Sequence, residues 1–297
     1  MEFRKLGIVG GGFMGRSIAQ KVASNGINVV VVEVSEEIAR QSRNELMASL
    51  DEELKKWGIT KSEKQVILGR VQFVADLGAL AATDILIETV TEELDLKKGV
   101  MSRLGGICPP DRIFITNTST LSISEIAAAS GRPDRVIGMH FMHSVQTSPI
   151  VELVRASDTS NETLATAVAF ARVLDKIVIE VTEYPGYVVT RTLLPLLNEA
   201  MHVVMEGVAS AEDVDLAVSL GYESKVGPLE YADRVGLDVV LGWMEHLFRE
   251  LGDVKYRPCP LLRKMVRAEH LGRKTGRGFF TYEGFQRTPA PRAEVAR

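Results

Sequence analysis

Cysteine, tryptophan and histidine are scarce in this chain, whose 297 residues include two, two and five of them. Cys108 and Cys259 stand far apart and have no metal-ligand spacing. We therefore expect free, inert thiols rather than a disulfide or a metal centre. The sequence predicts no bound metal.

Long apolar runs and an excess of positive charge are also missing. The net charge is -4, and no basic tract is long enough to attract nucleic acid. Even the apolar run at 187–197 is broken by Arg191 and Pro195, so it does not approach the length of a membrane span. Residues 1–5 lead directly into a glycine-rich segment, which is not typical of a signal peptide. We expect a cytoplasmic protein that binds neither membranes nor nucleic acid.

Glycine, in contrast, occurs in an informative pattern. Gly10, Gly12 and Gly15 have the Gly-x-Gly-x-x-Gly spacing of dinucleotide-binding turns, with Phe13 and Met14 between the last two. The first glycine allows a tight turn, the second lets backbone N–H groups approach a pyrophosphate, and the third lets a helix pack closely on the sheet. All five residues are candidates for cofactor binding.

The flanking residues predict a strand-helix-strand unit around these glycines. Apolar patterning indicates a strand at 6–9, a helix at 13–23 and a second strand at 29–32, with Glu33 directly after it. A carboxylate there accepts hydrogen bonds from ribose hydroxyls and repels a 2′-phosphate, so the sequence predicts NAD rather than NADP. The alternative is a purely structural turn followed by a solvated acid.

Short β-branched runs continue along the first part of the chain and alternate with helix-like stretches. A charged insertion at 36–69 is predicted to be helical, with an interruption at residues 57–58. The alternation predicts a mostly parallel, doubly wound Rossmann-type sheet in an α/β domain at 1–184. Further strands are expected at 71–74, 85–87, 113–116, 136–139, 151–154 and 177–181.

The pattern changes near Pro185, beyond which strand-like runs disappear and apolar residues recur at helical spacing. We predict an all-helical C-terminal domain at 185–297 that binds substrate and pairs with a second copy in a homodimer. Its tail, from Gly284, is expected to be poorly ordered. Helix starts are predicted by three capping boxes: Ser122 with Glu125, Thr159 with Glu162, and Ser210 with Asp213.

His140 is the candidate for acid-base chemistry. It follows the predicted strand at 136–139, at a strand end where ligands of open α/β sheets collect. Glu152 lies in the next predicted strand, and neighbouring strands can bring the two side chains together. A carboxylate bonded to one imidazole nitrogen fixes the tautomer and makes the other nitrogen more basic. The competing interpretation is a structural histidine in the core.

A polar cluster at 117–120 follows the strand at 113–116. Asn117 and Ser119 in this cluster could bond a nicotinamide or a substrate hydroxyl. Ordinary turn chemistry explains the same residues equally well.

Together these segments resemble the L-3-hydroxyacyl-CoA dehydrogenase family, above all its short bacterial members of the 3-hydroxybutyryl-CoA type. The resemblance covers nearly the whole chain, and several motifs occur in the family's order. They are residues 10–15, 88–94, 117–121, 138–141, 151–154, 185–188, 227–229 and 272–279.

The resemblance implies NAD-dependent oxidation of a 3-hydroxyacyl-CoA. His140 and Glu152 match the family's catalytic dyad, and Ser119 matches the serine that bonds the substrate hydroxyl. Asn117 matches a residue near the nicotinamide. Positions that line the cofactor site in the family correspond to Glu92 and Lys97.

The same resemblance implies contacts with coenzyme A. At the substrate site, however, the sequence departs from the family's pattern in two places. Ser49 and Lys56 fall where the family contacts coenzyme A, although Lys56 could equally be a solvated helix residue. His143 and Ser144 replace a usual Asn-Pro pair. Thr190 replaces an active-site asparagine, so the preferred substrate could differ from the family's.

Three alternatives follow from these residues. The first is a related dehydrogenase of a free hydroxy acid, such as L-gulonate or carnitine, which His143 and Thr190 keep open. The second is a non-catalytic dinucleotide-binding protein, against which the pairing of His140 with Glu152 speaks. The third is the β-hydroxyacid dehydrogenase group with a catalytic lysine, which the same pairing disfavours.

Overall fold

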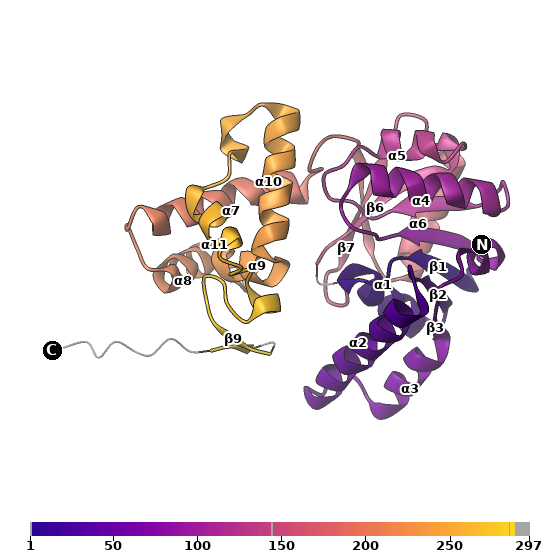
Figure 1. Ribbon diagram of the computed structural model, residues 1–297, viewed down its shortest axis with the longest axis horizontal. Helices are drawn as coiled ribbons and strands as arrows, with labels where there is room; N and C mark the ends of the chain where they lie inside the picture. Colours follow the sequence, from indigo (N-terminus) through magenta and orange to yellow (C-terminus); the bar gives the residue numbers. More distant parts are fainter. Residues whose placement is uncertain (1, 144, 285, 289–297) are drawn as a thin grey trace. The chain divides into compact units, whose positions relative to one another are not determined.

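The chain folds into two compact units in a computed structural model that describes residues 2–143, 145–284 and 286–288 (Figure 1). The first unit comprises Met1–Tyr187 and the second Val188–Arg297.

An eight-stranded sheet forms the centre of the first unit, with strand order β3-β2-β1-β4-β5-β6-β7-β8. Every neighbouring pair is parallel except β6 and β7, which are antiparallel. This confirms the Rossmann-type sheet predicted from the sequence. The strands are β1 (Lys5–Val9), β2 (Asn28–Val32), β3 (Val71–Val74), β4 (Ile85–Glu88), β5 (Ile113–Thr116), β6 (Val136–Phe141), β7 (Ile150–Arg155) and β8 (Ile177–Thr182).

Helices cover both faces of this sheet because its strands are apolar on both sides. Helices α1, α2, α3 and α6 contribute to one core, while α4, α5 and the short helix η1 contribute to the other. Their bounds are α1 (Phe13–Ser24), α2 (Glu36–Lys55), α3 (Lys61–Arg70), η1 (Leu77–Ala82), α4 (Leu94–Ile107), α5 (Ile123–Ala129), η2 (Pro133–Arg135) and α6 (Asn161–Val173).

The predicted helix start at Thr159 is wrong by one residue. Ser160 is the N-cap of α6, and its side chain accepts a bond from Thr163 N. Thr159 instead donates its hydroxyl to Val136 O at 2.7 Å, which ties the helix entrance to β6. Ser122 and Ser210 cap their helices as expected.

The second unit is built from helices around its own apolar core. The C-terminal segment departs from the all-helical prediction, because β9, just before the tail, and β10, within it, form a small antiparallel pair. Residues 289–297 of that tail lie outside the described residues. The elements are α7 (Val189–Met205), α8 (Ala211–Gly221), α9 (Pro228–Val235), α10 (Leu237–Leu251), η3 (Val254–Tyr256), α11 (Pro260–Arg267), η4 (Arg273–Thr275), β9 (Tyr282–Glu283) and β10 (Gln286–Arg287).

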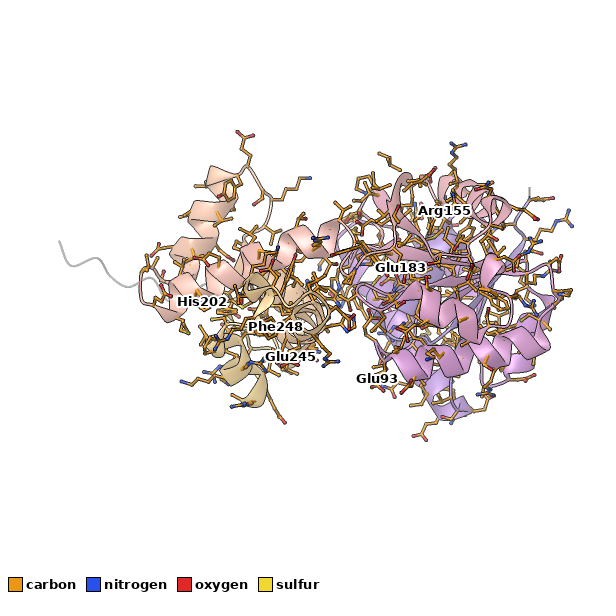
Figure 2. All side chains as sticks on the ribbon, turned by 90° about the horizontal axis from the view of Figure 1, so that it is seen from above. Glu93, Arg155, Glu183, His202, Glu245 and Phe248 are labelled. Carbon is orange, nitrogen blue, oxygen red and sulfur yellow. The ribbon has the colours of Figure 1, made fainter. Side chains whose placement is uncertain are left out.

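Figure 2 shows the side chains of both units, with His202 on α7 and Glu245 and Phe248 on α10 labelled in the second. Cys108 and Cys259 are free and buried, as expected. Within the described ranges, the helices are all too short or too polar to span a membrane.

Candidate active site

The turn between β1 and α1 depends on its glycines. Gly10 has a φ of +95°, a conformation that favours glycine. A Cβ atom on Gly15 would lie 1.9 Å from the Gly10 carbonyl oxygen, so only glycine lets α1 pack this closely. Gly12 faces open space, and in the described part of the chain no side chain caps the helix there. The N–H groups of the first helical turn are therefore available to a pyrophosphate, which fits a dinucleotide.

Glu33, at the end of β2, extends over this turn. Its Oε1 atom accepts bonds from Gly11 N at 2.7 Å and from Ser42 Oγ at 2.8 Å. The carboxylate is thereby fixed beside the glycines with its negative charge. This position suits ribose hydroxyls and is hostile to a 2′-phosphate, so the site fits NAD. The sequence did not reveal Ser42, which lies on α2 nine residues further along the chain.

His140 and Glu152 face each other across β6 and β7. They are direct partners in the antiparallel register, and His140 Nδ1 lies 2.6 Å from Glu152 Oε2. Glu152 is fully buried and His140 nearly so. Because the carboxylate accepts the Nδ1 proton, His140 Nε2 is left as the acceptor.

The position of His140 differs from the expectation in one respect. The strand was predicted to stop at residue 139, but β6 continues to Phe141 and contains the histidine. Pairing with β7 extends it, since Met139 and Phe141 also have partners there. The backbone that carries the imidazole is consequently held by pairing with β7 rather than lying in a loop.

Ser119 completes a chain of three side chains. Its Oγ atom lies 3.1 Å from His140 Nε2, so in this tautomer the hydroxyl donates to the imidazole. Ser119 is half-buried, whereas the two members of the pair are buried. The order Glu152, His140, Ser119 therefore runs from the interior towards the surface, which suits proton transfer to a ligand oxygen near Ser119.

Glu92 holds the loop that carries Ser119. Its Oε1 atom accepts bonds from Thr118 Oγ1 at 2.5 Å, Ser119 N at 2.8 Å and Thr120 N at 3.3 Å. One carboxylate oxygen thus fixes three consecutive residues. In the structure Glu92 thus bonds to the loop that carries Ser119, a contact that the sequence did not indicate.

Asn117 connects the same loop to the histidine strand. Its Oδ1 atom accepts a bond from Phe141 N at 3.1 Å, one residue after His140. The loop after β5 and the end of β6 are thereby joined through one amide.

Lys97 lies beneath this loop and is fully buried. Its Nζ atom is 2.8 Å from Glu88 Oε1, 3.1 Å from Val90 O and 3.4 Å from Asn117 O. Glu88 is buried too and also accepts a bond from Thr116 Oγ1 at 2.7 Å. Burial raises the pKa of the Glu88 carboxyl, and the nearby ammonium partly offsets this.

Glu88 was missed by the sequence analysis. The available signal was an acid at the end of an apolar strand, nine residues before a lysine in the following helix. Since Lys97 is enclosed by these acceptors, it supports the loop from below.

His143 stacks on Phe13 beside the glycine turn. The ring centroids are 4.5 Å apart and the planes 16° from parallel, while half of the Phe13 surface stays exposed. The stack joins the segment after β6 to the first turn of α1. Met14, also in the first turn of α1, is partly buried and packs against the apolar core. Ser144 lies outside the described residues.

Tyr187 is a third residue, after Ser42 and Glu88, whose position the sequence did not reveal. Its ring centroid is 5.6 Å from that of His140, and its hydroxyl donates to Leu121 O at 3.4 Å. Burial raises the pKa of this tyrosine well above its usual value, so its hydroxyl stays protonated.

The remaining candidates lie on other elements. Ser49 is half-buried on α2, and Lys56 is exposed at the end of that helix. Their spacing of seven residues puts both on one side of α2. This helix packs beside β3, at the far edge of the sheet from β7 and β8. Thr190 is buried in the first turn of α7, in the second unit.

Two family models match the chain. The model described as 3-hydroxyacyl-CoA dehydrogenase, NAD binding domain, matches residues 5–184. The model described as 3-hydroxyacyl-CoA dehydrogenase, C-terminal domain, matches residues 186–282.

Similar proteins cover almost the full length. A probable 3-hydroxybutyryl-CoA dehydrogenase from Bacillus subtilis is 43% identical over 283 residues, 95% of this chain and 99% of that protein. The crystal structure of (S)-3-hydroxybutyryl-CoA dehydrogenase from Ralstonia eutropha is 43% identical with a TM-score of 0.84, over 95% and 100% of the two chains.

A second solved structure has a different substrate in its name. It is a 5-formyl-3-hydroxy-2-methylpyridine 4-carboxylic acid 5-dehydrogenase, described as an NAD⁺-dependent dismutase. It is 29% identical with a TM-score of 0.73, over 95% of this chain and 92% of that one.

Proposed function

This chain belongs to the 3-hydroxyacyl-CoA dehydrogenase family, and we propose that it interconverts a short-chain (S)-3-hydroxyacyl-CoA and the 3-oxoacyl-CoA through the His140-Glu152 dyad. It is an enzyme, and its cofactor is NAD. The observation that carries the proposal is the bonded series Glu152, His140 and Ser119, with distances of 2.6 and 3.1 Å.

The proposed mechanism moves one proton and one hydride. In the oxidative direction, His140 Nε2 accepts the proton of the C3 hydroxyl, and Ser119 holds the hydroxyl oxygen. Glu152, already bonded to Nδ1, stabilises the imidazolium that forms. When bound, NAD⁺ supplies the hydride acceptor. In the reverse direction His140 returns the proton to the oxygen of the 3-oxo group.

For the cofactor, we assign the pyrophosphate to the first turn of α1, at Gly12, and the adenosine ribose to Glu33. Phe13 and Asn117 would line the path from there towards His140. Lys97 would support the loop that carries Ser119, because its ammonium is surrounded by protein acceptors. Glu92 would set the position of Ser119.

For the substrate, we assign Ser49 and Lys56 to coenzyme A and both His143 and Thr190 to the acyl portion. A lysine suits the phosphates of coenzyme A. The two substituted positions bear on chain length and on preference among acyl groups.

The test is a panel of 3-oxoacyl-CoA esters of increasing length, with loss of NADH absorbance as the readout and NADPH as the cofactor control. We expect turnover with acetoacetyl-CoA and NADH. His140→Gln should bind NADH normally and lose about 10²–10⁴-fold in kcat, the typical contribution of general acid-base catalysis. Near-native kcat in this variant would refute the assignment of the base.

A second candidate is a dehydrogenase of a free hydroxy acid, of the L-gulonate or carnitine type. It is favoured by His143 and Thr190, and by the solved relative that is named for a pyridine carboxylic acid. Comparing acetoacetyl-CoA with free acetoacetate as oxidants of NADH separates the two. Failure of every thioester, together with turnover of a free acid, would replace the first proposal with the second.

We also propose a homodimer formed through the helical C-terminal domain. Four apolar side chains on and beside α8 are largely exposed, which is a feature of interaction surfaces when they cluster. They are Val208 (72% exposed), Leu216 (56%), Leu220 (72%) and Tyr222 (73%). The cytoplasmic location expected from the sequence stays a prediction.

A further inference from the structure

The two tryptophans of the chain have opposite surroundings. Trp243 packs against the core of the second unit. Trp57 lies between α2 and α3 and is 94% exposed. An indole is a large apolar surface, and leaving it in water brings no benefit to folding. Packing within the folded chain therefore does not account for an indole at this position.

The backbone at Trp57 is fixed in a conformation that suits glycine better. Its φ is +58°, in the left-handed region. The turn is closed by bonds from Trp57 N to Leu54 O at 3.2 Å and from Gly58 N to Glu53 O at 2.9 Å. A bulky residue here costs folding free energy, and the exposed side chain recovers little of it.

The next helix holds the turn from the other side. Thr60 caps α3, and Glu63 bonds back to Thr60 N at 2.7 Å in a reciprocal capping box. The indole thus projects from a rigid support, which lowers the entropic cost of binding a flat ligand.

Cations flank the indole. Lys55 and Lys56 precede it and Lys61 follows it. The acidic side chains nearby are engaged within the chain: Glu52 with Lys55, Asp51 with Lys64, and Glu53 with Gln20. An aromatic face beside ammonium groups suits a nucleobase that carries phosphates.

The bound dinucleotide does not supply this base. Its adenosine is assigned to Glu33, next to the start of α2, whereas Trp57 follows the end of that helix. The 20 residues of α2 span about 30 Å at 1.5 Å per residue. A second adenine is needed, and a CoA thioester carries one together with its phosphates.

We propose that Trp57 is the adenine platform of the CoA site, stacking on the base of the acyl-CoA substrate. The proposal rests on the function proposed above and adds a subsite to it. It explains why an exposed indole occupies a position that prefers glycine.

Fluorescence provides the direct test, because the chain has only two tryptophans. In Trp243→Phe, Trp57 is the single indole. Stacking predicts saturable quenching by coenzyme A and by adenosine 3′,5′-bisphosphate, and none by pantetheine. Coenzyme A that binds by calorimetry without changing this fluorescence would overturn the proposal.

Kinetics provide the second test. Trp57→Gly keeps the backbone conformation and should fold. Its KM for acetoacetyl-CoA should rise by roughly 5- to 150-fold, the range for one base-aromatic stack, with kcat unchanged. Its KM for acetoacetyl-pantetheine, which lacks adenine, should equal that of the parent. Trp243→Phe is the matched control and should change neither KM.

The outcomes separate this inference from the proposed function. Equal KM values for acetoacetyl-CoA in Trp57→Gly and the parent would refute the platform and leave the dehydrogenase intact. A parent inactive with both thioesters, and unquenched by coenzyme A, would refute both. Trp57 variants that change only the oligomeric state would instead identify a contact between copies and overturn the proposal.

Discussion

Three side chains from distant parts of the sequence form the proposed reactive group, and the roles proposed for them follow from their order. Glu152 is inaccessible to solvent, His140 is almost so, and Ser119 is the most exposed of the three. In the proposed mechanism Glu152 therefore acts through the imidazole, and the ligand meets Ser119 and His140 Nε2.

Glu152→Gln tests that role. The variant keeps the size of the side chain but lacks the charge that stabilises the imidazolium. Hydrogen bonds to charged groups contribute about 1.5–3 kcal/mol. We therefore expect kcat to fall roughly 10- to 150-fold while the Kd for NADH stays unchanged.

Glu152→Asp is the matched control, since it keeps the charge at a greater distance. Its kcat should lie between those of the parent and Glu152→Gln. Steady-state kinetics and NADH fluorescence supply both quantities, and a Gln variant as active as the parent would contradict the role given to the carboxylate.

At the scale of elements, Glu88 at the end of β4 and Lys97 on α4 form a buried pair, and Lys97 also bonds Asn117 O in the loop after β5. Lys97→Met leaves the Glu88 carboxyl buried without its cation. Breaking a buried ion pair typically costs about 3–5 kcal/mol. We expect a loss of that order in the free energy of unfolding, measured with urea, together with lower activity because the Ser119 loop rests on this pair.

The double variant Glu88→Gln, Lys97→Met checks the explanation. It removes both charges, so much of the lost stability should return. If the double variant is no more stable than Lys97→Met, the loss arises from packing rather than from an unpaired charge.

A second buried acid joins α9 to the C-terminal segment. Asp233 accepts bonds from Phe279 N at 3.0 Å, Phe280 N at 2.9 Å and Tyr282 OH at 3.0 Å. Burial nevertheless dominates and raises the pKa of Asp233 to about 6. Because the unfolded chain releases this proton near pH 3.9, the protonated form favours the folded state below pH 6.

The stability that this proton contributes is present at low pH and is lost as the pH rises through 6. From pH 5 to pH 8 the change amounts to about 1.4 kcal/mol for one group whose pKa is about 6. Relative to Asp233→Asn, the parent should therefore lose that much stability over this range. Urea unfolding followed by Trp243 fluorescence measures it, and parallel curves for the two proteins would refute the titration.

At the scale of the whole molecule, the proposed dimer contact consists of the exposed residues Val208, Leu216, Leu220 and Tyr222. If they form the dimer contact, Leu216→Glu with Leu220→Glu places four acids in one interface and should yield monomers. Light scattering should give twice the chain mass for the parent and the chain mass for the variant. An unchanged mass would move the interface elsewhere.

Much of the molecule follows from local patterns in the sequence. The Gly10-Gly12-Gly15 turn, the acid at Glu33 and the strand at 113–116 depend on residues close in the chain, so periodicity and spacing were sufficient. The helix start at Thr159 was misplaced because its hydroxyl bonds β6, a contact between distant residues that no local pattern contains.

The tertiary structure decided which polar groups meet. The sequence predicted that neighbouring strands could bring His140 and Glu152 together, but only the antiparallel register of β6 with β7 makes them direct partners. Tertiary packing likewise decided that Glu92 bonds the loop that carries Ser119, that Glu88 lies beside Lys97, and that His143 stacks on Phe13. Residue identity and short-range spacing thus specified the cofactor and the candidate base. Strand register and helix packing, which join residues 9 to 130 positions apart, determined how those groups are held.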